Sequence, residues 1–481
     1  MNSKFKLIKG AVVAPRGFLA SGVFCDIKRL GTGKGSNKGQ KRDLALIVSE
    51  VPATVAGMFT TNQVCAAPVK VCIERVKKGT AQAIVVNSGN ANACTGKQGL
   101  QDAREMTALV AAELSRCSVG CPQPTGLRED TQRYSIKPEH VLVGSTGRIG
   151  VTLPMDNVRA GIIEACVELG STHEHAAHAV EAIMTSDTRP KQIAVEFKLG
   201  GKTVRMGGIC KGAGMIQPGM SATGARPAAL HATMLGFITT DAAIEAKALQ
   251  AALREAVAQS FNRITVDGDM STNDTVLVLA NGLGGNRRLV GRASSRAGSS
   301  VASPHRDLAT FQSALNHVCL ELAKMIVRDG EGVHRVVTVR VNGAKTVADA
   351  DAAARAVANS PLVKTSWHGG DPNWGRIIDA LGYSPAKIVE EKVDIGYSSA
   401  FASDASARQA GRGKILWSLK RGQPTKATFK QLCATVAPKE FDLHINLNLG
   451  AASAVIYAAD LTEAYVDFNK GDVGDPGSLG G

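Results

Sequence analysis

Residues 211–242 read KGAGMIQPGMSATGARPAALHATMLGFITTDA and combine a lysine, a glycine turn and several threonines. Within this stretch, Thr233 follows Ala232 and precedes an apolar run. A threonine hydroxyl is a weak nucleophile at neutral pH, so it needs a base beside it. If the bond between Ala232 and Thr233 were cut, the new α-amine, which titrates near about pH 8, would supply that base. A strand that enters a hydrophobic core explains the same dipeptide, so the pair alone leaves both interpretations open.

Further motifs stand on both sides of this stretch. They are FTTN (59–62), NSGNANACTG (87–96), STG (145–147), DGDMSTNDT (267–275), RDGEG (328–332) and DPNWGR (371–376). Together with KGAGM (211–215) and ATMLGFITTDA (232–242), they resemble, in the same order, the motifs of the ornithine acetyltransferase (ArgJ) family. The resemblance extends from about Gly10 to Asn469.

This resemblance implies a fold and a processing event. The fold is α+β, a layered α/β/β/α arrangement of the ArgJ/DmpA-like type with two αβ halves. Autocatalytic cleavage between Ala232 and Thr233 divides the chain into an α chain, residues 1–232, and a β chain, residues 233–481. The α chain carries an oxyanion-binding turn, and the β chain begins with the nucleophile.

The same resemblance implies a glutamate N-acetyltransferase of arginine biosynthesis. The acetyl group passes from N2-acetyl-L-ornithine to Thr233 and then to L-glutamate, which is a ping-pong reaction. The catalytic residues are Thr233, Thr146 and Gly147, and the substrate-binding residues are Thr185, Lys211, Thr233, Glu331 and Asn469. The sequence leaves open whether acetyl-CoA is a co-substrate.

The proposed roles fit the chemistry of acyl transfer. Negative charge develops on the carbonyl oxygen, and fixed donors such as the Thr146 hydroxyl and the Gly147 N–H stabilise it, by about 3 to 4 kcal/mol each in known cases. Both amino acids carry an α-carboxylate, for which Lys211 is the candidate cation, while Glu331 could hold a substrate ammonium. A surface residue or an ordinary salt bridge also explains Glu331 and Asn469.

Three features depart from the family pattern. About ten extra residues, Ser221–His231, precede Ala232, which makes Ala222–Thr223 a rival cleavage site. The tail after Asn469 lacks the expected hydroxyl residue. Arg148 stands beside the oxyanion turn, where the family has an apolar residue. We favour Thr233 because the residues after it keep the family register.

Sequence patterns predict individual elements. Short apolar runs predict buried strands at residues 44–48, 65–71, 83–86, 141–144 and 275–280. Leu249, Leu253 and Val257 are spaced four apart, which predicts a helix from about 242 to 261 with Asp241 as its N-cap. Two αβ halves favour a layered α+β fold over an alternating barrel.

Composition argues against a membrane-spanning protein and a nucleic-acid-binding protein. The 481 residues are 44% hydrophobic and 20% charged, as in globular proteins, and no apolar run reaches the roughly 18 residues of a membrane span. Much of the net charge of +14 lies at 34–42 and 287–306, which we interpret as surface loops. Because these patches lack an aromatic-rich binding motif, we expect no nucleic-acid partner. A hydrolase of related fold, an N-terminal-nucleophile aminopeptidase or amidase, remains the alternative function.

Histidines and cysteines do not predict a metal site. His173, His175 and His178 do not share one helix face, and Cys117 and Cys121 have no second pair. We therefore expect no metal and no cofactor. The ten cysteines, with no secretory signal before them, favour free thiols in the cytoplasm, or in the mitochondrial matrix of a eukaryote. The partners we expect are the small-molecule substrates N2-acetylornithine and glutamate. We also expect the α and β chains to associate and the αβ pairs to form a higher oligomer.

Overall fold

A long strand, β3 (Leu44–Thr60), lies at the centre of the fold. The computed structural model describes residues 5–28, 41–116, 135–223, 234–291, 303–399 and 414–470. β3 pairs with β4 (Thr80–Asn90) over its first part and with β11 (Thr275–Ala280) over its second. Most of β3 is apolar and buried, which suits a central strand covered on both faces.

β3 belongs to a ten-stranded sheet in the described part of the chain. The path through the sheet is β1-β6-β7-β9-β11-β3-β4-β5, and both β2 and β8 pair with β3. The further strands are β1 (Lys6–Leu7), β2 (Phe18–Val23), β5 (Val141–Arg148), β6 (Lys191–Leu199), β7 (Lys202–Lys211), β8 (Met220–Ser221) and β9 (Leu235–Thr240).

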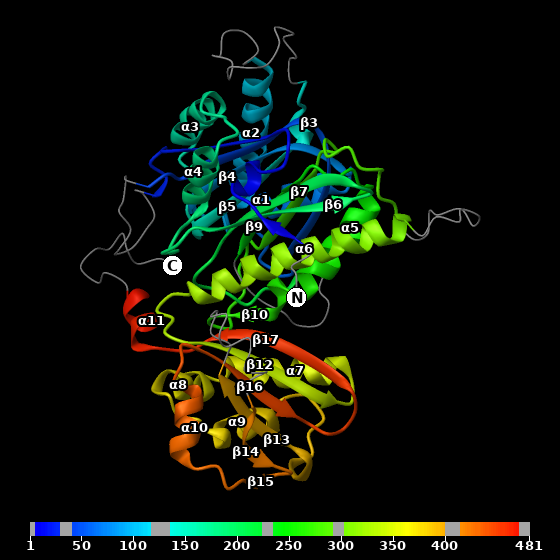
Figure 1. Ribbon diagram of the computed structural model, residues 1–481. Helices are drawn as coiled ribbons and strands as arrows, with labels where there is room; N and C mark the ends of the chain where they lie inside the picture. The colour runs from blue at the N-terminus through cyan, green and yellow to red at the C-terminus, as the bar shows by residue number, and fades with distance from the viewer. Residues whose placement is uncertain are drawn as a thin grey trace.

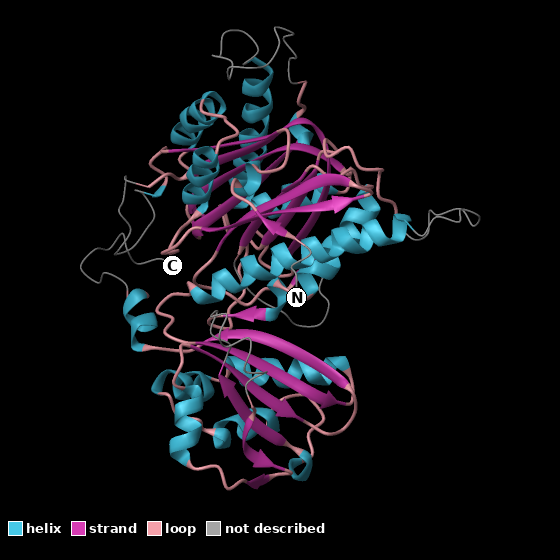
Figure 2. Cartoon of the chain, in the orientation of Figure 1, coloured by secondary structure: helices cyan, strands magenta, loops and turns pink. Residues whose placement is uncertain are grey.

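Helices cover both faces of this large sheet (Figure 2). One face packs on α1 (Ala67–Val76), α2 (Gly96–Arg116), α3 (Met155–Val167) and α4 (His173–Ile183), and the other on α5 (Ala246–Ala258) and α6 (Ser303–Arg328). In β11, Leu277 faces the first core and Val276 and Val278 face the second. This alternation follows from the two-residue period of a strand.

Among the described residues, a seven-stranded sheet forms the lower part of the molecule in Figure 1. Its order is β10 (Ile264–Thr265), β17 (Ala452–Ala459), β12 (Val336–Ala344), β16 (Glu440–Asn446), β13 (Asp394–Ser399), β14 (Leu416–Lys420) and β15 (Gln423–Pro424). Its helices are α7 (Val347–Asn359), α8 (Pro361–Gly369), α9 (Trp374–Gly382) and α10 (Phe429–Val436). α11 (Glu463–Phe468) lies beside the boundary between the two sheets (Figure 1). Short 3-10 turns occur at Ala11–Val13, Pro138–His140, Phe261–Arg263 and Glu390–Lys392.

The predicted α+β class is confirmed, and most predicted elements are present. Two predictions were wrong. Residues 65–71 belong largely to α1, where a proline in the first turn starts the helix and Val69, Cys72 and Val76 share its buried face. Asp241 caps no helix, because α5 begins after Glu245, and the Asp241 carboxylate accepts hydrogen bonds from the N–H groups of Arg16 and Arg205.

The division at residue 232 stays a prediction, because residues 224–233 lie outside the described part of the chain. So do residues 34–40, most of the 287–306 patch, and Cys117 and Cys121. The eight described cysteines are free thiols, as expected. Within the described residues, no helix is both long and apolar enough to cross a membrane.

Candidate active site

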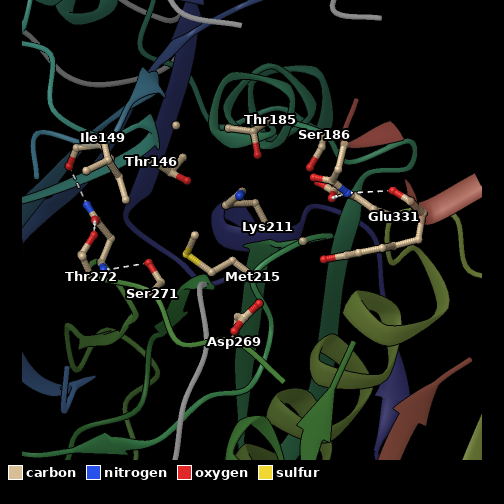
Figure 3. Close-up of a pocket in the computed structure, with 16 residues that line it drawn as sticks. Thr146, Ile149, Thr185, Ser186, Lys211, Met215, Asp269, Ser271, Thr272 and Glu331 are labelled. Carbon is tan, nitrogen blue, oxygen red and sulfur yellow. Dashed lines mark hydrogen bonds between the residues drawn. The ribbon is translucent and has the colours of Figure 1, made fainter. Parts of the chain in front are cut away.

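A cavity of about 360 Å³ lies where loops from the large sheet meet α11 (Figure 3). Six predicted site residues line it, and they are Thr146, Gly147, Thr185, Lys211, Glu331 and Asn469. The remaining two, Ala232 and Thr233, are outside the described residues. Residues separated by more than 300 positions in the sequence therefore meet in one pocket.

Thr146 and Gly147 lie at the end of β5, which pairs in parallel with β4. Gly147 has φ of 131°, and a Cβ at this position would lie 2.3 Å from the carbonyl carbon of Gly89. Only glycine allows β5 to approach β4 this closely. Thr146 is almost fully buried, and its side chain points into the pocket (Figure 3).

Asn273 holds this strand end against the neighbouring loops. Its amide Nδ2 donates to the backbone oxygens of Ala91, at 2.6 Å, and Ser145, at 2.8 Å. The hydroxyl of Ser145 in turn donates to Asn87 Oδ1 at 2.6 Å. The wall that carries Thr146 is therefore fixed by buried hydrogen bonds.

Lys211 is the last residue of β7 and is only 3% exposed. Its ammonium lies 4.0 Å from Asp187 Oδ2, beyond hydrogen-bonding distance. Burial lowers the pKa of Lys211, while the nearby Asp187 carboxylate opposes this shift. The N–H groups of Lys211 are thus directed at a pocket in which a carboxylate ligand would stabilise the charge.

Asp187 connects this lysine to a buried network of charges. Its Oδ1 accepts hydrogen bonds from Lys191 Nζ at 2.6 Å and from Gly212 N at 2.7 Å, and its Oδ2 accepts one from Thr185 N at 3.0 Å. Burial alone would raise the pKa of Asp187, but Lys211 and Lys191 hold it below its usual value. Lys191 also contacts Asp329, so two cations and two anions balance here.

The glycine turn after β7 brings Lys211 close to Glu331. A Cβ on Gly214 would lie 2.4 Å from the carboxylate carbon of Glu331, so a larger residue here would displace the Glu331 side chain. Asp267 fixes the turn, because its carboxylate accepts the N–H of Met215 at 2.6 Å and of Ile216 at 2.8 Å. Burial raises the pKa of Asp267.

α11 completes the pocket opposite the oxyanion turn. Asn469, which follows this helix, donates from Nδ2 to Glu331 Oε2 at 3.1 Å and to Tyr465 O at 2.9 Å. Glu331 N donates to Ala213 O at 2.9 Å. Glu331 and Asn469 therefore form one hydrogen-bonded unit at the pocket, in which Asn469 is exposed.

Asp274 is a buried carboxyl group for which the sequence analysis gave no role. Its Oδ1 accepts the N–H of Met234, the residue that follows Thr233, and its Oδ2 has no hydrogen-bond partner among the described residues. Burial raises the pKa of Asp274 well above its usual value. The motif 267–275 was recognised, but only the structure shows that this position contacts the chain next to the predicted nucleophile.

Three comparisons relate the chain to known proteins. A model of the ArgJ family matches residues 27–471. The chain is 44% identical over 463 residues to "Arginine biosynthesis bifunctional protein ArgJ" of Symbiobacterium thermophilum, which covers 96% of this chain and 98% of the relative. It is 41% identical over 466 residues to "Glutamate N-acetyltransferase" of Methanocaldococcus jannaschii, again with 96% and 98% covered.

A solved structure of "Ornithine Acetyltransferase complexed with Ornithine" from Mycobacterium tuberculosis is 36% identical and covers 45% of this chain and 100% of that chain, with a TM-score of 0.38. The family match extends over nearly the whole chain, and the relatives span its length at about 40% identity. The resemblance that the motifs carried is confirmed. The chain belongs to the ArgJ family.

Proposed function

We propose that the protein is a glutamate N-acetyltransferase, an acyltransferase that moves acetyl from N2-acetyl-L-ornithine to L-glutamate. The observation that carries the proposal is the charge pattern of the pocket. Lys211 and Glu331 line the same cavity as Thr146 and Gly147. The Lys211 cation suits the α-carboxylate of an amino acid, and the Glu331 anion suits its ammonium. Thr146 and Gly147 suit an oxyanion.

The reaction begins with self-cleavage. The Thr233 hydroxyl attacks the carbonyl carbon of Ala232, the peptide C–N bond breaks, and the amine of Thr233 takes the proton. Water then hydrolyses the Ala232 ester, which leaves a carboxylate at Ala232 and both a free amine and a free hydroxyl on Thr233. The hydrogen bond from Met234 N to Asp274 supports this assignment, because it fixes the chain directly after the nucleophile.

Acetyl transfer repeats the same chemistry on a ligand. The Thr233 hydroxyl loses its proton to the α-amine and attacks the acetyl carbonyl of N2-acetylornithine. The oxyanion accepts hydrogen bonds from Thr146 Oγ1 and Gly147 N, and ornithine leaves after it receives the proton. The amine of glutamate then attacks acetyl-Thr233, which forms N-acetylglutamate and restores the hydroxyl.

The two chains stay associated after the cut, and αβ pairs form a higher oligomer in the cytoplasm. β9, which follows Thr233, lies between β7 and β11, and this interleaving of segments supports the association. The name of the Symbiobacterium relative includes "bifunctional". We therefore propose acetyl-CoA as a second acetyl donor, which is tested by measuring N-acetylglutamate formed from acetyl-CoA and glutamate.

The test combines intact mass with an activity assay. We expect the purified wild type to consist of two chains, the first ending at Ala232. Without glutamate it should release only about one equivalent of ornithine per active site, as Thr233 is acetylated, and sustained release should require glutamate. Thr233→Ala removes the nucleophile, so it should leave the chain whole and reduce ornithine release by at least about a thousandfold.

Thr223→Ala is the matched control, because Thr223 is the threonine of the rival cleavage site. We expect this variant to be cut and active like the wild type. If Thr223→Ala stays uncut, the nucleophile is Thr223 and the assignment to Thr233 is wrong. Many turnovers of ornithine release without glutamate would instead identify a hydrolase of the amidase class, because water would then be the acetyl acceptor.

A further inference from the structure

A second group of polar side chains lies outside the pocket, where α8 meets the segments that flank α11. His334 precedes β12, His368 lies in the last turn of α8, and Asp460 follows β17. One donor atom of each residue lies within 4.8 Å of the other two. None of the three lines the candidate active site. Three separate segments of the chain therefore converge on one point.

Two atoms of this group are buried and lack hydrogen-bond partners among the described residues, namely Asp460 Oδ2 and His368 Nδ1. Asp460 is 4% exposed, and its Oδ1 accepts the N–H of His334 at 3.0 Å. The unpartnered Oδ2 faces His368 Nδ1 at 3.5 Å. A buried carboxylate oxygen without a partner is unfavourable, so this arrangement calls for a positive charge.

Glu463 determines which nitrogen of His368 can bind a cation. Its carboxylate Oε2 lies 2.9 Å from His368 Nε2, so Nε2 carries the hydrogen in this pair. In a neutral imidazole the lone pair then resides on Nδ1, the atom that faces Asp460. A histidine that binds a metal through one ring nitrogen commonly donates the N–H of its other ring nitrogen to a carboxylate, as His368 does to Glu463.

The distance between the two donors favours a metal ion over a proton. A protonated imidazole that donates to a carboxylate does so at about 2.7 to 2.9 Å. Two ligands that bind one metal ion at about 2.0 to 2.1 Å with a tetrahedral angle lie about 3.3 Å apart. The observed 3.5 Å is close to the second value.

The neighbouring cation does not occupy the position between the donors. Lys364, on α8, donates its ammonium hydrogen to the backbone oxygen of Ala459 instead of to Asp460. His334 is exposed and His368 is about one-third exposed, so an ion can enter and water can complete its coordination. The exposed ring of His334 is also able to rotate toward the other donors.

We propose that His334, His368 and Asp460 bind one divalent transition-metal ion of the zinc class. Two imidazole nitrogens and one carboxylate oxygen are the ligands that such ions accept. Glu331 lies three residues before His334, and α11, which carries Tyr465 and leads to Asn469, begins three residues after Asp460. The ion ties these two segments together and so positions the Glu331–Asn469 unit without contacting substrate.

The experiment measures binding directly and does not depend on catalysis. The full-length protein is treated with a chelator, dialysed, and titrated with Co²⁺ alone, which reports an N/O ligand set by its visible absorption. We expect one Co²⁺ per chain, displaced by one equivalent of Zn²⁺. Zn²⁺ should also raise the midpoint of thermal unfolding, because it binds only the folded chain.

His368→Gln and Asp460→Asn should abolish the Co²⁺ spectrum, and Glu463→Gln should weaken binding by about tenfold. His334→Gln keeps the test decisive if a buried variant fails to fold, because His334 is exposed. His175→Gln, on α4, is the matched control and should bind like the wild type. The proposal would be overturned if the wild type took up no stoichiometric Co²⁺. It would also be overturned if His334→Gln and Glu463→Gln bound Co²⁺ as tightly as the wild type.

Discussion

Asp187 sets the charge balance of the pocket at the scale of a single residue. Its carboxylate contacts Lys191 at 2.6 Å and Lys211 at 4.0 Å, and its side chain is fully buried. Removing one member of a buried ion pair leaves the other charge without compensation, which is more costly than the loss of one contact. Asp187 therefore supports both the stability of the fold and the orientation of Lys211.

Asp187→Asn is expected to lower the free energy of unfolding at pH 7 by about 3 to 5 kcal/mol. The folded-state pKa of Asp187 lies below its usual value, so its contribution is fully present above about pH 4 and is lost as the pH falls toward that lowered pKa. The difference between wild type and variant should therefore shrink below about pH 4. Urea unfolding of both proteins at pH 7 and at pH 3 measures this difference in the free energy of unfolding.

Glu168→Gln is the control, because Glu168 is an exposed carboxylate after α3. We expect its free energy of unfolding to stay within about 0.5 kcal/mol of the wild type. An Asp187→Asn variant as stable as Glu168→Gln would contradict the assigned role. The assigned role would also be contradicted if the stability difference between wild type and Asp187→Asn grew as the pH fell.

At the level of residues, the motifs named side chains whose catalytic and binding roles stay predictions. Thr146, Gly147, Thr185, Lys211, Glu331 and Asn469 were all assigned from the family resemblance, and the structure brings them to one pocket. No sequence motif indicated a role for Asp187 or Asp274. Their burial arises only when distant strands assemble, and an aspartate in a polar motif carries no local sign of burial.

At the scale of elements, the end of β5 decides where the oxyanion donors stand. Gly147 combines φ of 131° with a backbone neighbour, Gly89, that leaves no space for a Cβ. Gly147→Ala must therefore push β5 away from β4 and displace the N–H of residue 147. We expect kcat to fall by about 100-fold or more, as when one oxyanion donor is lost. Steady-state kinetics with N2-acetylornithine and glutamate measure this.

Gly150→Ala separates this displacement from backbone strain alone. Gly150 also has positive φ, 83°, but a Cβ there would meet no atom within 4 Å. Its variant should lose about 1 to 2 kcal/mol of stability and keep kcat within a few-fold of the wild type. Equal losses of kcat in both variants would show that the approach of β5 to β4 is not the cause.

Elements with a clear periodicity were predicted well, and two errors have a physical explanation. The apolar run at residues 65–71 is too short for its periodicity to separate a strand from a helix, and only the full length of α1 shows a helical period. Asp241 has the side chain of an N-cap, yet backbone N–H groups from distant segments use its carboxylate. Length decided the first case and tertiary contacts decided the second.

At the scale of the molecule, the large sheet joins segments from both sides of the proposed cut. β9 pairs with β7, which precedes the cut, and with β11, which in turn pairs with β3. We therefore expect the cleaved chains to elute together in size-exclusion chromatography and to separate only in denaturant. Separation of the two chains without denaturant would contradict this strand order.

Uncut Thr233→Ala protein is the control for this experiment. Since the same strands are present in the same order, it should elute at the same volume as the cleaved wild type. An earlier or later elution would mean that cleavage changes the assembly as well as the covalent structure.

The strand order itself was beyond reach from the sequence. The α+β class was predicted from the mixture of strand and helix patterns together with the family resemblance. A sheet in which β11 separates β9 from β3 depends on pairings between residues more than 200 positions apart. Local periodicity carries no information about such partners.

The position of β11 also determines when the precursor can mature during its synthesis. The ribosome releases residues in order, so β3 and β4 emerge long before Ala280 completes β11. Until then β9 and β3 have no strand between them, and the large sheet stays open. Glu331 and Asn469 emerge later still. The proposed cut at Thr233 therefore awaits translation past β11, and a nascent chain that stalls before Ala280 remains a single, unprocessed polypeptide.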